Sequence, residues 1–113
     1  MKARLTLAIA LCLAAGPAVA QSFNDYPTSA RADYVFACMK VNGDTRVALD
    51  KCSCSIDIIA SILPYDRYET AETFMSLAQI QGENGALFRQ SEPAKKATDE
   101  LHRAQAEADI RCF

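Results

Sequence analysis

The chain has 113 residues, five cysteines and a formal net charge of −2 at neutral pH. This length suits one small domain and not two. The acidic balance argues against nucleic acid as a partner, because binding nucleic acid normally needs a clustered basic surface. The basic residues near the C-terminal end, such as Lys95 and Arg103, are scattered among acids instead.

Residues 1–20 have the three parts of a secretory signal peptide. Lys2 and Arg4 provide a basic start, an apolar run follows, and an Ala-Val-Ala sequence ends the segment. The apolar run is too short to span a bilayer, which takes about 20 apolar residues. We therefore expect cleavage after residue 20, loss of Cys12 with the leader, no membrane insertion after cleavage, and a location in the periplasm or outside the cell.

The next residues predict the start of a helical domain. Residues 21–27 are polar and aperiodic, so we expect a flexible N-terminus followed by one domain over residues 28–113. Thr28 or Ser29 is predicted to cap a first helix that ends near Gly43. Its apolar residues recur at spacings of three and four and include Tyr34, Val35, Cys38 and Val41.

A second helix is predicted over residues 46–63, capped by Asp44 or Thr45 and ended by Pro64. It carries two apolar stripes, so we expect it to be central and buried. Asp66 is predicted to cap a third helix over residues 67–81.

The segment from Gly82 to Gly85 predicts a break after the third helix, with a short apolar turn at residues 86–88. Ser91 is predicted to cap the last helix, whose apolar stripe continues to Cys112. The fold class is therefore all-α, a small bundle of four to five short helices.

Four cysteines remain after the leader, and their even number in an exported chain predicts two disulfides. Cys52 and Cys54 point to opposite sides of a helix and should not pair with each other. Two patterns stay open: Cys38–Cys52 with Cys54–Cys112, or Cys38–Cys54 with Cys52–Cys112. A disulfide-exchange centre at Cys52 and Cys54 is the main functional alternative.

Little in the sequence indicates catalysis or a cofactor. A zinc site built from the cysteines and His102 fails on spacing and on the oxidising compartment, and no serine-nucleophile motif is present. We expect a protein that is not an enzyme and holds no metal. The best candidate contact surface is Tyr65, Asp66, Arg67 and Tyr68, because tyrosine and arginine commonly anchor interfaces, although these tyrosines could instead close the core. Phe113 is a second candidate anchor.

The motifs around Cys38, around the Cys52-Ser53-Cys54 pair, at the Leu63-Pro64-Tyr65 break and at the terminal Cys112 resemble those of small exported four-cysteine helical proteins of proteobacteria. In size and architecture the chain is also similar to periplasmic acid-stress chaperones and to immunity proteins that block cell-wall-cleaving toxins. No functional motif of either group matches residue by residue, so neither activity carries over.

These observations favour a periplasmic protein that binds another protein as a subunit, an inhibitor or an immunity protein. A thiol-disulfide redox protein and an acid-stress chaperone are the two alternatives. The sequence leaves open the partner, the disulfide pattern and the oligomeric state.

Overall fold

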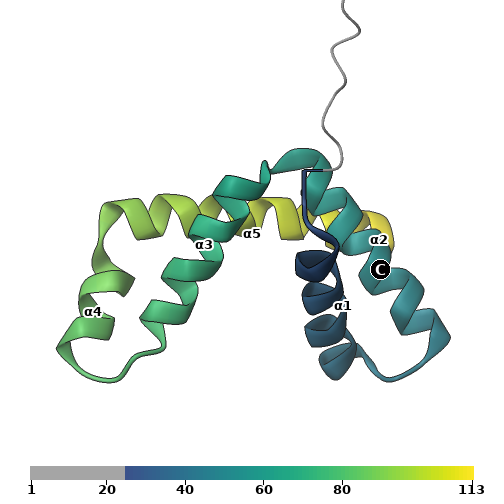
Figure 1. Cartoon of the computed structure of the whole chain (residues 1–113), viewed down its shortest axis with the longest axis horizontal. Coiled ribbons are helices and arrows are strands. Elements are labelled where there is room, and N and C mark those ends of the chain that lie inside the picture. The colour runs from purple at the N-terminus through teal and green to yellow at the C-terminus, as the bar shows by residue number, and fades with distance from the viewer. Residues whose placement is uncertain (1–24) are drawn as a thin grey trace, which may run out of the picture.

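The computed structural model describes residues 25–113, so the predicted leader and residues 21–24 lie outside the described part of the chain. The described residues form five helices, which confirms the predicted all-α fold (Figure 1). They are α1 (Thr28–Asn42), α2 (Arg46–Ile62), α3 (Tyr65–Ala78), α4 (Glu83–Gln90) and α5 (Glu92–Cys112). None of these five helices has the length and apolar character needed to cross a membrane.

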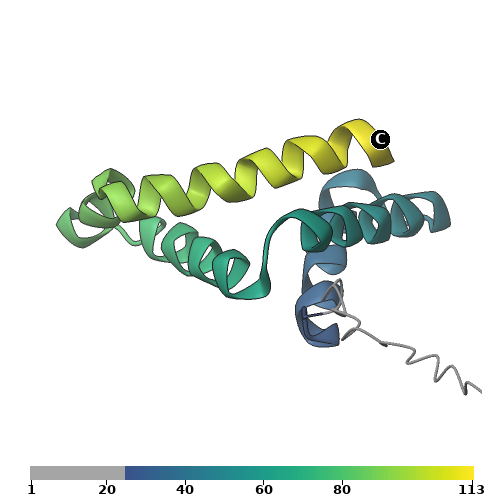
Figure 2. The same ribbon diagram turned by 90° about the horizontal axis from the view of Figure 1, so that it is seen from above.

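The helices are arranged as an arch with two legs (Figure 1). The 21-residue helix α5 spans the arch, and the hairpins α1–α2 and α3–α4 form its legs. Seen from above, α2 and α3 follow one another along α5, against which both pack (Figure 2). Helices α1 and α3 therefore lie on the facing sides of the two legs (Figure 1).

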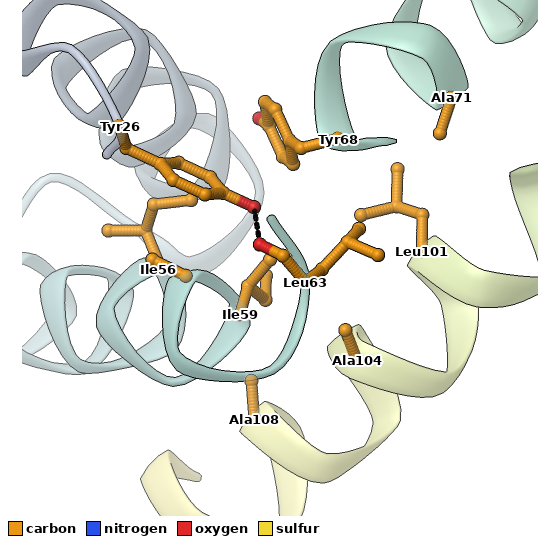
Figure 3. Packing of buried hydrophobic residues seen from close by; sticks show 10 residues of the cluster. Tyr26, Ile56, Ile59, Leu63, Tyr68, Ala71, Leu101, Ala104 and Ala108 are labelled. Carbon is orange, nitrogen blue, oxygen red and sulfur yellow. Dashed lines mark hydrogen bonds between the residues drawn. The ribbon is translucent and has the colours of Figure 1, made fainter. Parts of the chain in front are cut away.

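The core lies where α2 and α3 pack against α5 (Figure 3). On α5, Ala104 and Ala108 are completely buried, and their small size lets α5 approach α2 closely. Ile56, Ile59 and Leu101 are the largest apolar side chains that are almost completely buried, each worth about 1.5 to 3 kcal/mol on burial. The predicted central position of α2 is confirmed for this face, whereas its residues Val47 and Ile62 are exposed.

Two disulfides hold α2 from two sides. Cys38–Cys52 joins α1 to α2, and Cys54–Cys112 joins α2 to the end of α5. Two residues turn a helix by about 200°, which is why the neighbouring cysteines reach different partners. This pairing is the first of the two patterns that the sequence left open. Loop-closure entropy gives about 3 kcal/mol for the shorter loop and about 4 kcal/mol for the longer one.

Side-chain caps begin two of the helices as the sequence predicts. The hydroxyls of Thr45 and Ser91 accept hydrogen bonds from the amides of Ala48 and Ala94. The prediction that Thr28 or Ser29 caps α1 is wrong, because α1 begins directly after Pro27 and has no side-chain cap. Gly43 follows α1 with a φ of 107°, a backbone conformation that glycine adopts without strain.

The junction between α2 and α3 is completed by residues that precede α1. Tyr26 donates a 2.7 Å hydrogen bond from its hydroxyl to the carbonyl oxygen of Leu63 (Figure 3). The Asp25 carboxylate accepts a 2.8 Å hydrogen bond from the Tyr65 amide. Helix ends leave such carbonyls and amides without intrahelical partners, so this dipeptide satisfies both sides of the break at Pro64.

Asp66 does not cap α3 as predicted, because the helix already begins at Tyr65. Its carboxylate accepts a hydrogen bond from the adjacent amide of Arg67, within the first turn. The first amide of α3 is instead bound by Asp25, a residue 40 positions earlier. Sequence spacing cannot show a cap that comes from so far away.

Tyr26 belongs to the core, although the sequence placed it in a flexible segment. Its side chain is 4% exposed, and its ring lies 5.2 Å from that of Tyr65 and 5.0 Å from that of Tyr68. Burial, and secondarily the charge of Asp25, raise the pKa of its hydroxyl, which therefore stays a neutral donor. The domain thus begins before α1.

The region after α3 differs from the prediction. Helix α3 ends at Ala78, and the residues predicted as a short turn belong to the eight-residue helix α4. Gly85 lies inside α4, where a β-carbon would collide with the carbonyl oxygen of Ile80. The glycine predicted to break a helix instead allows α4 to pack closely on the preceding loop.

We predict that Tyr26→Phe lowers the free energy of unfolding by about 1 to 2 kcal/mol, because it leaves the Leu63 carbonyl without its buried partner. Tyr26→Ala should cost about 3 to 5 kcal/mol, since it also removes a buried ring. Urea unfolding followed by circular dichroism measures both values. Equal stability of Tyr26→Phe and the native protein would show that this hydrogen bond does not secure the junction.

Candidate functional site

The two legs of the arch enclose an open cleft of about 880 Å³. Asp33 and Phe36 on α1 line one wall, and Glu72 on α3 lines the other. Asp109 on α5 and the terminal Phe113 also line it. The lining residues thus come from α1, α3 and α5, with Ser55 contributed by α2.

Helix α1 is held at the edge of the fold by a few specific contacts. None of its fifteen residues is buried, although it packs on α2. The Cys38 disulfide fixes its second half, and a 2.8 Å hydrogen bond joins Tyr34 to Ser55. A 2.6 Å ion pair between Arg31 and Asp57 adds a surface contact. Helix α1 is therefore tethered to α2 while much of its surface stays open.

Large apolar side chains are exposed along the cleft. Phe36 is 63% exposed, Val41 is 86% exposed and Phe113 is 51% exposed, and all three line the cavity. Val41 is the last of the periodic apolar residues predicted for the first helix, and it is exposed, unlike the half-buried Tyr34 and Val35. Phe113 is exposed, as a candidate anchor must be.

A second hollow lies on the other flank of α1, between α1 and α2. Its volume is about 500 Å³, and its apolar lining includes Val35, Phe36, Met39 and Leu49. Phe36 lines both hollows and so stands on the ridge between them. Apolar surface therefore continues around α1 from one flank to the other.

Carboxylates face each other across the cleft. Asp33 on α1 and Glu72 on α3 both line it, and they also line a neighbouring hollow that includes Glu69. Partial desolvation raises the pKa of Glu72, and the charge of Asp33 raises it further. The ionised form of Glu72 is therefore disfavoured at this place in the fold.

The four residues of the predicted contact surface, Tyr65, Asp66, Arg67 and Tyr68, differ in their exposure to solvent. Tyr68 is buried and Tyr65 is half-buried, and both pack against Tyr26. Asp66 is exposed, and the exposed Arg67 forms a 2.6 Å ion pair with Glu100 of α5. The two tyrosines mainly close the core, which was the alternative interpretation of this segment.

The cysteines and His102 were the candidates for redox or metal chemistry. Cys52 is completely buried, and the four cysteines of residues 25–113 are all joined in disulfides. His102 is exposed on α5. Within the described part of the chain, no three histidine, cysteine or acidic side chains lie close enough together to hold a metal ion.

The sequence singled out Tyr68 and Phe113, which line the cleft, but gave no prediction for Asp33, Phe36 and Glu72, which line it as well. Phe36 gave one usable signal, because it is a large aromatic residue that lies off the apolar stripe of its helix. No comparable signal joins Asp33 to Glu72, since their proximity depends on how the two legs are placed around α5. No protein-family model, curated protein or solved structure matches the chain. The resemblance to exported four-cysteine proteins therefore stays a prediction.

We predict that Glu72→Gln stabilises the protein slightly at pH 7, by less than about 1 kcal/mol because solvent screens this exposed site. A raised carboxyl pKa means that ionised Glu72 costs stability above that pKa. The cost is relieved as the pH falls, so the gain from Glu72→Gln should vanish below about pH 4. Urea unfolding at several pH values measures it.

Asp33→Asn is the companion variant, because it removes the neighbouring charge and keeps Glu72. It should yield part of the same gain at pH 7. A gain from Glu72→Gln that grew as the pH fell would contradict the assignment.

Proposed function

We propose that this chain is a non-enzymatic binding or accessory protein of the periplasm, which acts by holding a partner protein in the cleft between its two legs. The observation that carries the proposal is the exposed apolar surface of α1. Helix α1 buries none of its residues, yet it presents Phe36 and Val41 to the cleft.

Exposed aromatic residues beside a cavity are typical of protein-binding surfaces. Phenylalanine is enriched at the centres of interfaces, where it fills pockets that exclude water. Phe36 and Phe113 reach the cleft from α1 and from the end of α5. A partner seated there would cover apolar surface that the fold itself leaves in contact with water.

The two disulfides indicate an oxidising environment outside the cytoplasm. Together with the predicted leader, they favour the periplasm. The redox alternative fits less well, because Cys52 is completely buried, so that an attacking thiolate could reach the Cys38–Cys52 disulfide only at the half-buried Cys38. Cys52 and Cys54 are also bonded to separate partners and not to each other.

The test is a pull-down from periplasmic extract with the oxidised protein and a Phe36→Ser/Phe113→Ser variant. Both side chains are exposed, so the variant should stay folded while losing the partner. The matched control is Ile80→Ser/Leu87→Ser, which changes two exposed apolar residues at the far leg. We expect the control to retain the partner.

A partner that binds the native protein and the Phe36→Ser/Phe113→Ser variant equally would contradict binding in the cleft. A partner lost with the control variant alone would move the contact surface to the far leg. Circular dichroism of all three proteins confirms that each is folded.

A further inference from the structure

The carboxylates that line the cleft have no cationic partners. Between residues 25 and 113, five ion pairs form, and none of them includes Asp33, Glu69, Glu72 or Asp109. The first three face the gap between α1 and α3, and Asp109 lies on α5. The ion pairs of the fold thus lie elsewhere, and the cleft keeps its negative charge.

Positive charge at the cleft is limited. Lys40 is the one cation among the described residues that line it, and its ammonium lies 4.4 Å from the centre of the Phe36 ring. Lys51 lies near the edge, with its ammonium 5.4 Å from the centre of the Phe113 ring. Both ammonium groups thus form cation–π contacts with these rings. Four carboxylates therefore face one lysine within the cleft and its neighbouring hollow.

The aromatic residues of the cleft already carry the kind of contact that a cationic ligand would make. Lys40 and Lys51 show that the faces of Phe36 and Phe113 accept ammonium groups. Burial and the charge of Asp33 raise the pKa of Glu72, and a cation placed beside Glu72 would stabilise its ionised form. Glu72 therefore also favours a cationic ligand. Acidic and aromatic groups together suit a ligand that is both basic and apolar.

We propose that the occupant of the cleft is a segment of a partner protein that sets lysine or arginine side chains against Asp33 and Glu72, and an aromatic side chain against Phe36 and Phe113. This inference rests on the proposed function and specifies the chemistry of its partner. A second copy of this chain fits less well than a basic partner, because without the predicted leader the chain has ten basic and fourteen acidic residues, so that two copies carry charge of the same sign.

The test is an NMR titration of the ¹⁵N-labelled oxidised protein with a defined probe, the capped peptide Lys-Phe-Lys-Ala-Lys-Phe-Lys. Two further peptides replace every lysine by glutamate or every phenylalanine by alanine. We expect the basic aromatic peptide to shift amide signals of α1, α3 and the end of α5. Either replacement should weaken binding by about tenfold or more, because both charge and apolar contact are needed.

The charge dependence has its own matched variants. Asp33→Asn/Glu72→Gln should weaken binding of the basic peptide by about tenfold, whereas Glu83→Gln/Asp99→Asn should leave it nearly unchanged. Both variants alter the net charge by the same amount, and Glu83 and Asp99 are exposed outside the cleft. Raising the salt from about 50 to about 500 mM should weaken binding by the native protein, because salt screens charges in solution.

Absence of binding by the basic aromatic peptide, equal binding of the glutamate peptide, or signal changes away from the cleft would overturn the inference. Equal effects of the two charge variants would overturn it as well. The proposed function is judged separately by the pull-down. A partner lost with Phe36→Ser/Phe113→Ser but kept by Asp33→Asn/Glu72→Gln would support a binding protein whose partner is not basic.

Discussion

The fold depends on the way in which the central helix α2 is held. Cys52 and Cys54 are two residues apart and leave α2 in different directions, so one disulfide reaches α1 and the other reaches α5. The two attachments differ in what supports them. Helix α5 also packs its buried face against α2, whereas α1 has no fully buried residue and is held by its disulfide, a few polar contacts and the partial burial of Tyr34 and Val35.

A second constraint sets the direction of the far leg. Pro64 breaks the chain between α2 and α3, and Asp25 and Tyr26 bind the polar groups on either side of the break. These two hydrogen bonds secure the junction, after which α3 follows α2 along α5 (Figure 2). The cleft is thus a consequence of these two attachments, and its charged and aromatic lining is available to a partner.

The sequence predicted the parts of the fold that depend on local pattern. Short-range rules were enough to predict the helices, two of their caps and the break at Pro64. They also predicted that the four cysteines form two disulfides. It did not predict contacts between distant residues, such as the bond of Asp25 to the start of α3 or the burial of Tyr26. The apolar stripe of α1 faces α2 at Tyr34, Val35 and Cys38, which are half-buried, but its last member Val41 is exposed. Periodicity shows which residues share a face but not how far a neighbouring element covers it. The cleft was missed because its two walls come from different legs.

The central claim is that α1, which has no fully buried residue, is tethered to α2 chiefly by a disulfide, with weaker support from a few polar contacts and the partial burial of Tyr34 and Val35. Hydrogen exchange of the variant Cys38→Ser/Cys52→Ala, compared with the native protein, tests this claim most directly. The claim predicts that the amides of α1 lose protection by about tenfold or more, while the second half of α2 and helices α3 and α5 keep theirs. Undiminished protection of α1, or an equal loss throughout the domain, would contradict it.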